Sequence, residues 1–434
     1  MAWYVLFILY ILLLFVFLFM GYWVPFALGT TGLIGLLLLG DSHVFQSLGF
    51  VAWNGVNSFE LTAIPLFILM GELILSSGVS DRFFHSTSVL LRKIPGGLFQ
   101  TNIVSCGFFS AISGSSLATA AAVGSVSIPE LSKRGYNRSM IYGSLGGGGA
   151  LGILLPPSIP LIIYGSMVEE SVAKLFMAGV VPGLLAILIF MIYIGIRCLL
   201  NSNLTSHVEE GSLSLKQKFK SIGGLLPITV LIVIIAGGIY LGYTTPTESA
   251  GLGVILSLVI CAIYKKLTYI NVKSAIINAV RTSSMVLFIV VGAQILSYLI
   301  VQSGINRGLT DWIISIDPSP VTFLFIVFVV YLILGCVVDG LSLIFLTLPV
   351  LWPLVQAVGF DPIWFGIVLV ILIEVSQITP PVGLNLYVLQ GIAGEKASFS
   401  EIVKGNIPYF FLYLFIALLV TFFPQIALWL PSKM

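Results

Sequence analysis

Charged side chains are scarce in this sequence: Asp, Glu, Lys and Arg make up 8% of its 434 residues, against roughly 25% in a typical soluble protein. Only four cysteines and three histidines occur, and none has the spacing of a metal site. Basic and acidic residues nearly balance, with a net charge of +2, which is not typical of a nucleic-acid binder. These scarcities exclude a soluble globular enzyme, a disulfide scaffold, a transition-metal site and a nucleic-acid-binding protein.

Long hydrophobic runs dominate the sequence, and hydrophobic residues make up 58% of the chain. A membrane-spanning helix needs about 20 apolar residues. Residues 1–40 are long enough for two such helices, and further apolar runs lie near 60–76, 138–168, 171–200, 221–243, 247–264, 275–301, 362–392 and 405–430. No segment resembles a soluble domain, so we predict an all-α polytopic membrane protein surrounded by lipid.

The two halves of the chain repeat a series of landmarks in the same order. Each half has two glycines 36 residues apart, then a third glycine followed 21 residues later by Pro-Pro: Gly78, Gly114, Gly135 and Pro156-Pro157, then Gly304, Gly340, Gly359 and Pro380-Pro381. Such a series indicates an internal duplication. We therefore predict N-terminal scaffold helices at 1–44, a first repeat at 45–200, a connecting loop with scaffold helices at 201–269, and at 270–434 a second repeat with a C-terminal scaffold helix.

Each repeat contains two segments that a simple spanning helix does not explain. The first is a pair of short apolar runs around a polar tip, near 98–130 and 319–356, with tips at 113–116 and 338–341. Runs this short favour a re-entrant helical hairpin. The second is a long apolar run with Pro-Pro inside it, at about 138–168 and 362–392. Two prolines in succession break a helix, and broken backbone at membrane depth is tolerated only around a cavity or inside protein.

The placement of basic residues predicts that the two repeats are inverted. If the base of the first hairpin, which carries Arg92, Lys93, Lys133 and Arg134, lies in the cytoplasm, only Lys174, Arg307 and Lys433 fall outside. This asymmetry agrees with the positive-inside rule. The base of the second hairpin carries no Lys or Arg, so this hairpin enters from the other side. Inverted repeats with helices broken at the midplane are typical of secondary transporters.

That geometry favours the movement of an anion with a cation. Four half-helices are predicted to begin at mid-membrane, and each N-terminus has roughly +0.5 of a charge and free N–H donors, which together suit an anion without a dedicated Lys or Arg. Half-helices that end at the same depth present carbonyl oxygens, which suit Na⁺. The hydroxyls of Ser113, Ser116 and Thr379 are placed to complete such sites.

Several of these segments resemble a known family, the large membrane subunit of tripartite ATP-independent periplasmic (TRAP) transporters. The resemblance covers most of the chain and rests on Ala63 to Phe67 (AIPLF), Ser113-Gly114-Ser115-Ser116, Gly135-Tyr136, Gly152 to Pro160 (GILLPPSIP), Thr244 to Glu248 (TTPTE) and Ile378 to Leu386 (ITPPVGLNL). It implies a multi-pass protein of the bacterial inner membrane with an elevator-type movement. It also implies Na⁺ coupling without a further cofactor, a small membrane (Q) subunit, and a periplasmic substrate-binding (P) protein.

By the same resemblance, main-chain carbonyls supply most ligands of two Na⁺ sites. The first is expected from Ser113, Ser116, Gly152, Leu155 and Pro157, and the second from Gly335, Ser376, Thr379 and Val382. The family often has glycine where this chain has Ser376. Substrate contacts are expected from Ser115, Ser158, Asp339, Gly340, Pro381 and Asn385. Substrates of the family include C4-dicarboxylates, sialic acids and other sugar acids, and nothing in the sequence chooses among them.

Some residues have a second interpretation, in which their role is structural. Asp339 is equally suited to capping the helix after it, and Asn385 to bonding nearby backbone. Glu374 is ionisable within an apolar run, which usually indicates function, although it would also be tolerated near the membrane interface. The glycines at 146–149 are explained either by close helix packing or by a hinge. Glu248 is expected to be structural.

The same sequence features also bear on three other functions. A stand-alone cation-coupled carboxylate carrier with related inverted hairpins is the closest rival, and a channel could also use broken helices. An intramembrane serine protease would need a base at depth, but every histidine lies in a polar connection. The sequence also lacks a Gly-x-x-x-x-Gly-Lys-Ser/Thr loop, so neither enzymatic activity nor nucleotide hydrolysis is expected.

Overall fold

The computed structural model of the chain describes residues 2–40, 43–205, 215–336, 338–394 and 397–434. Over these residues the chain is helical and contains no strand, which confirms the predicted all-α fold. Six of the described helices are long and apolar enough to cross a membrane, or seven spans if a bent pair at Gln46–Val56 and Glu60–Ser76 counts as one. Residues 206–214 of the polar loop predicted at 201–220 lie outside the described residues.

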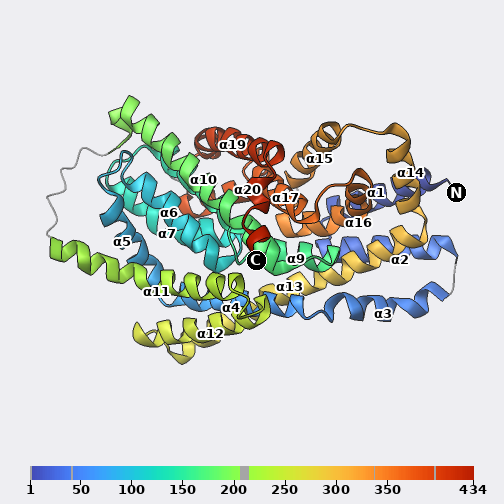
Figure 1. Cartoon of the computed structure of the whole chain (residues 1–434), viewed down its shortest axis with the longest axis horizontal. Helices are drawn as coiled ribbons and strands as arrows, with labels where there is room; N and C mark the ends of the chain where they lie inside the picture. The colour runs from blue at the N-terminus through green and yellow to red at the C-terminus, as the bar shows by residue number, and fades with distance from the viewer. Residues whose placement is uncertain (1, 41–42, 206–214, 337, 395–396) are drawn as a thin grey trace.

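One layer of the molecule consists of long helices from the N-terminal and middle segments. The longest, α13 (Tyr269–Gln302), packs along α2 (Val24–Leu39), α3 (His43–Val56) and α4 (Ala63–Ser76). Two further helices, α11 (Leu215–Tyr240) and α12 (Pro246–Ile263), pack on each other and extend the layer beside α4. These helices run along one side of the molecule in Figure 1. The helix α1 (Trp3–Phe19) packs on α2 at one end.

The first predicted hairpin and broken helix correspond to four helices. The hairpin consists of α6 (Leu98–Ser113) and α7 (Ser116–Lys133), which pack on each other and on α8 (Arg138–Gly149). A short 3-10 turn at Ala150–Ile153 and irregular backbone separate α8 from α9 (Ile159–Val168). The helix α7 is longer than predicted, because it continues through Pro129 to a polar last turn in which Arg134 pairs with Glu130 at 2.6 Å. The helix α10 (Val172–Leu200) follows.

The second half has the same series of helices. Its hairpin consists of α15 (Pro320–Gly335) and α16 (Gly340–Val358), and its broken helix of α17 (Pro362–Gln377) and α18 (Leu384–Ala393). The helix α16 has 19 residues and is long enough to span, which corrects the prediction of a short run, because Asp339 caps it inside the predicted tip and it continues to Gly359. The helices α19 (Phe399–Phe422) and α20 (Gln425–Leu428) complete the chain.

Two short helices precede the hairpins and were not predicted: α5 (Val79–Leu91) and α14 (Ile305–Ile316). Neither forms a long apolar run, because polar and charged residues are interspersed along both. Each follows a glycine in the left-handed region, with φ of 69° at Gly78 and 72° at Gly304. These two glycines are the first landmarks of the repeat, so equivalent positions in the two halves have the same local backbone geometry.

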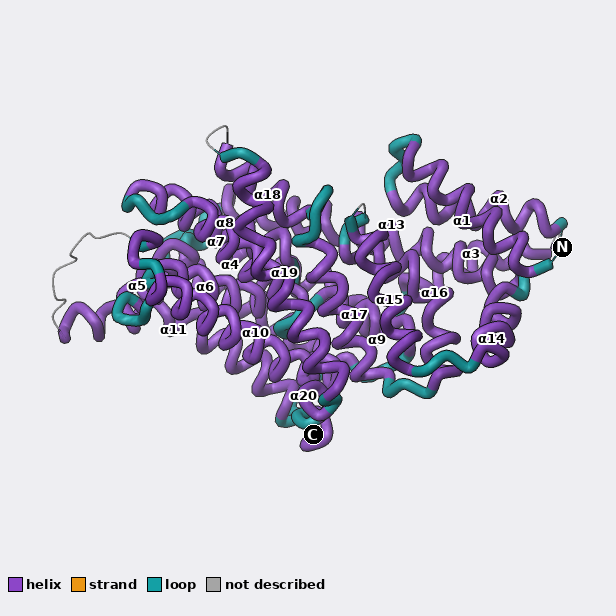
Figure 2. Tube along the Cα trace, turned by 90° about the horizontal axis from the view of Figure 1, so that it is seen from above, coloured by secondary structure: helices purple, strands orange, loops and turns teal. Residues whose placement is uncertain are grey.

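The helices α10 and α19 pack with the hairpins and broken helices. The main contacts of α19 are with α8 and α17, and α10 contacts α6, α9, α17 and α19. Side chains added at Gly146 or Gly147 would overlap Asn406 or Tyr409 of α19, so the glycine run permits close helix packing. The helix predicted as the C-terminal scaffold therefore packs directly on the hairpin and broken-helix elements. Figure 2 shows α17, α9 and α16 near the middle of the long axis.

Candidate functional site

The tip of the first hairpin lies directly on the first helix break. The helix α6 ends at Gly114, whose φ of 58° is in the left-handed region, and Ser115 caps the start of α7. A Cβ added at Gly152 would lie 2.5 Å from the carbonyl carbon of Ser115, and one added at Gly114 would lie 2.8 Å from the carbonyl oxygen of Pro157. Only glycine at these positions lets the two backbones approach this closely.

Hydroxyl groups surround this contact. The Ser113 Oγ lies 2.8 Å from the Thr119 Oγ1 and donates to the Ser115 carbonyl at 3.2 Å. The Ser158 hydroxyl donates to the Ile153 carbonyl while its oxygen caps α9. Of the residues predicted for this side, the structure therefore brings together Ser113, Ser115, Ser116, Gly152, Pro157 and Ser158. The Leu155 side chain packs towards Gly107 of α6 and Gly183 of α10, so only its main chain is available to an ion.

The tip of the second hairpin lies on the end of α17 in a similar way. A Cβ added at Gly340 would lie 2.6 Å from the Ile373 Cγ2, and one added at Gly335 would overlap the Ser376 side chain. The Ser376 hydroxyl donates to the Ile373 carbonyl at 2.7 Å, and the Thr379 hydroxyl to the Val375 carbonyl at 2.6 Å. Both oxygens keep lone pairs for a cation. The structure thus brings Gly335, Gly340, Ser376 and Thr379 together.

Four other predicted residues differ in their surroundings. The Asp339 Oδ2 accepts from the backbone N–H groups of Leu341 and Ser342, both at 3.1 Å, so Asp339 caps α16. Asn385 is fully buried, and neither polar atom of its side chain has a hydrogen-bond partner in the described residues. Pro381 is exposed and Val382 half-buried, whereas the Pro156-Pro157 break on the other side is buried.

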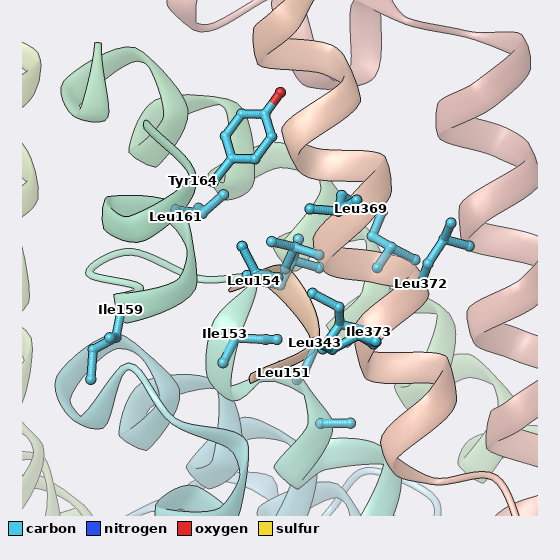
Figure 3. Close-up of a cluster of buried hydrophobic side chains, with 14 of the residues drawn as sticks. Leu151, Ile153, Leu154, Ile159, Leu161, Tyr164, Leu343, Leu369, Leu372 and Ile373 are labelled. Atoms are coloured by element: carbon cyan, nitrogen blue, oxygen red, sulfur yellow. The ribbon is translucent and has the colours of Figure 1, made fainter. Parts of the chain in front are cut away.

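Elements of the two halves meet at this site. The helix α17 packs on the 3-10 turn at Ala150–Ile153, and α16 packs on α9. In Figure 3, Leu369, Leu372 and Ile373 of α17 lie beside Leu151, Ile153 and Leu154, with Leu343 of α16 between the two groups. This apolar contact excludes water from the surroundings of the tips, which strengthens electrostatic interactions there.

Glu374 is the acidic residue of this region that the sequence analysis left undecided. Its side chain is fully buried, and its Oε1 accepts from the Ser116 Oγ at 2.7 Å and from the Ile153 N–H at 3.1 Å. Glu374 therefore belongs to the site rather than to an interface with solvent. The sequence signal was its position two residues before Ser376 in an otherwise apolar run.

The site has no basic side chain of its own. No Lys or Arg occurs between Lys93 and Lys133, between Arg138 and Lys174, or between Arg307 and Lys396. Those ranges contain both hairpin tips and both breaks. The donors available to an anion are the N-termini of α7, α9 and α18, which begin at the tips and breaks, because Asp339 already accepts from the first turn of α16. This is the donor set that helix N-termini offer to phosphates and carboxylates.

Sequence comparison agrees with this arrangement. Residues 11–426 match the family described as the DctM component of the tripartite ATP-independent periplasmic transporter. The chain belongs to this DctM family. The C4-dicarboxylate TRAP transporter large permease protein DctM of Pseudomonas aeruginosa is 33% identical over 94% of each chain. The sialic acid TRAP transporter large permease protein SiaM of Vibrio cholerae is 31% identical over 92% of this chain and 97% of its own.

Solved structures support the fold of this DctM-family chain. The YdaH transporter of Alcanivorax borkumensis has a TM-score of 0.60 at 12% identity, over 88% of this chain and 90% of its own. MtrF of Neisseria gonorrhoeae has a TM-score of 0.57 at 13% identity, over 90% of this chain and 85% of its own. Family membership and the spanning helices identify the chain as the large permease subunit of a TRAP transporter, integral to the bacterial inner membrane. This outcome favours the TRAP assignment over a stand-alone carrier.

The family motif Thr244 to Glu248 has a structural explanation. The Glu248 N–H donates to the Thr245 Oγ1 at 3.3 Å, and the Glu248 Oε2 accepts from the Thr245 N–H at 2.8 Å. This reciprocal pair is a capping box at the start of α12. Glu248 is therefore structural, as the sequence analysis expected.

Proposed function

We propose that this permease uses a Na⁺ gradient to carry an organic carboxylate into the cell. The observation that carries the proposal is the contact of each hairpin tip with a helix break, within the ranges 94–132, 139–173 and 308–395 that contain no Lys or Arg. An anion held there depends on helix N-termini and on bound cations for its charge balance. Carbonyls at the breaks and the hydroxyls of Ser113, Ser116 and Thr379 are oxygen ligands that suit Na⁺.

The substrate class follows from this donor set and from the relatives. Permeases similar to this chain are named for C4-dicarboxylate, sialic acid, 2,3-diketo-L-gulonate and isethionate. Each of these is an acid whose anionic group suits a helix N-terminus. We propose that a periplasmic substrate-binding (P) protein delivers the anion and that a small membrane (Q) subunit completes the transporter. One relative of this chain is named DctMQ.

We also propose an elevator-type movement in which the hairpins, broken helices, α10 and α19 move together past the layer of α2–α4 and α11–α13. The close contacts of α19 with α8 and α17 support grouping these helices as one body. At the boundary between the two groups, Pro156 and Pro157 of the first break face the apolar side chains of Ile232, Ile235 and Ile239 of α11. An apolar boundary without directional bonds favours sliding of one layer on the other.

Uptake is expected to require Na⁺. The permease, its small subunit and its binding protein would be reconstituted in proteoliposomes and offered labelled C4-dicarboxylates, sialic acids and sugar acids. An inward Na⁺ gradient should drive accumulation, and an equal K⁺ gradient should leave uptake at the level of protein-free vesicles, because the proposal assigns the coupling sites to Na⁺. Full uptake driven by K⁺ or by a proton gradient alone would contradict Na⁺ coupling, and uptake driven by ATP without an ion gradient would contradict a secondary transporter.

The two tips are expected to become accessible from opposite sides of the membrane. In a background without Cys106, Cys198, Cys261 and Cys336, Ser115→Cys should react with a membrane-impermeant maleimide from the cytoplasm, and Leu341→Cys from the periplasm. Both residues are half-buried, so substrate with Na⁺ should change both rates. Tyr269→Cys, on the outer layer and 80% exposed, is the control whose rate should stay constant. Labelling of both tips from one side under all conditions would rule out inverted repeats.

A further inference from the structure

Glu374, on α17 of the second repeat, contacts two elements of the first repeat through one of its carboxylate oxygens. Its Oε1 accepts a hydrogen bond from Ser116, at the tip of the first hairpin, and another from the Ile153 N–H, at the first break. On its own helix, Glu374 precedes Ser376 of the second cluster by two residues. The carboxylate, on a helix of the second half, therefore contacts the first predicted cluster directly.

The other oxygen of this carboxylate is unsatisfied. The Glu374 Oε2 is buried and has no hydrogen-bond partner among the described residues. No salt bridge to Glu374 is present in that part of the chain either. An ionised carboxylate in this place would have an uncompensated charge, and a protonated one would have an O–H without an acceptor. Either state is costly in a buried site, so this oxygen needs a partner that the described residues do not provide.

We propose that the Glu374 Oε2 is a direct ligand of a Na⁺ ion bound beside the first hairpin tip. The two hydrogen bonds to Oε1 orient the carboxylate and leave Oε2 free for the cation. An oxygen ligand with a full negative charge suits a hard cation better than a neutral carbonyl does. This inference rests on the proposed Na⁺ coupling and adds a charged ligand to sites otherwise built from neutral oxygens.

A charged ligand at this position also predicts an order of binding. Without Na⁺, an ionised carboxylate repels an anionic substrate strongly because the surroundings are apolar, and a protonated one provides no charge to hold the cation. With Na⁺ bound to Oε2 the charge is balanced, and the helix N-termini can attract the substrate. Na⁺ should therefore bind before the substrate.

The test is Na⁺ binding to the purified protein, measured as the rise in its unfolding temperature when Na⁺ replaces K⁺ at constant ionic strength. Glu374→Gln keeps an oxygen for Ser116 and Ile153 but removes the charge, and it should weaken the apparent Na⁺ affinity by about tenfold or more. Glu248→Gln is the matched control: it makes the same change at an exposed carboxylate, and it should leave the affinity unchanged because glutamine also accepts in a capping box.

The outcomes separate this inference from the proposed function. If the wild-type protein shows no response to Na⁺, the proposed Na⁺ coupling fails. If the wild type responds and Glu374→Gln responds with the same affinity, only the Glu374 ligand is wrong. If Glu374→Gln does not fold, the wild-type protein can be tested by infrared spectroscopy after labelling with ¹³C-carboxyl glutamate. The difference spectrum between Na⁺ and K⁺ should contain an isotope-shifted carboxylate band. The absence of that band would overturn the inference.

Discussion

Replacing Gly152 by alanine is expected to reduce uptake by roughly 10- to 100-fold, because the added methyl group has no space. Its Cβ would lie 2.5 Å from the Ser115 carbonyl carbon, which is backbone and cannot rotate away. The hairpin tip would have to lift from the break, at a cost of about 1–3 kcal/mol for overpacking, and the carbonyls of the break would separate from the Ser116 hydroxyl. The measurement is Na⁺-driven uptake in proteoliposomes with matched amounts of folded permease.

Gly195→Ala, in α10, is the control for this substitution. The nearest atom to a Cβ at Gly195 is the Gln100 Nε2 at 3.8 Å, which is ordinary contact, and alanine is the better helix former. This variant should transport normally and be at least as stable as the wild type. Normal transport by Gly152→Ala would mean that the contact between tip and break is not part of the transport site.

Loss of transport is also expected for Pro157→Ala and for Pro381→Ala. Proline disfavours a helix interior by about 3 kcal/mol relative to alanine, so alanine lets helix extend into each break. The carbonyls of the break would then bond within the helix and be withdrawn from the predicted Na⁺ sites. Each variant should reach the membrane in normal amounts, bind Na⁺ weakly in the thermal assay, and transport at the level of protein-free vesicles.

Pro227→Ala provides the comparison for these two variants. Pro227 lies inside the long helix α11 of the outer layer, where no break exists, so its replacement should leave uptake near the wild-type rate. If Pro157→Ala and Pro381→Ala also transport at the wild-type rate, the breaks are not ion sites. A difference between the two would distinguish the buried first break from the second, whose prolines are exposed.

The sequence alone was sufficient for the features that depend on local chemistry. Low charge and long apolar runs determine a membrane protein, because lipid requires helices whose backbone groups are paired internally. The Pro-Pro pairs and the glycines at Gly114 and Gly359 place helix ends, since their effects act on adjacent backbone. The positions of α6, α7, α15 and α16 followed from these signals, apart from the lengths of α7 and α16, because α7 continues into a polar last turn and α16 begins inside the predicted tip.

Other features depend on which helices touch, and no local pattern contains that information. Ser116 and Glu374 are 258 residues apart in the chain, yet their side chains share one hydrogen bond, so Glu374 could be suspected from sequence but not placed. The packing of α19 on α8 depends on close contact at Gly146 and Gly147, and that of α10 on the first break depends on close contact at Gly179 and Gly183. Apolar helices of similar composition are interchangeable by hydropathy, and only steric fit between particular surfaces decides which of them pack around the site.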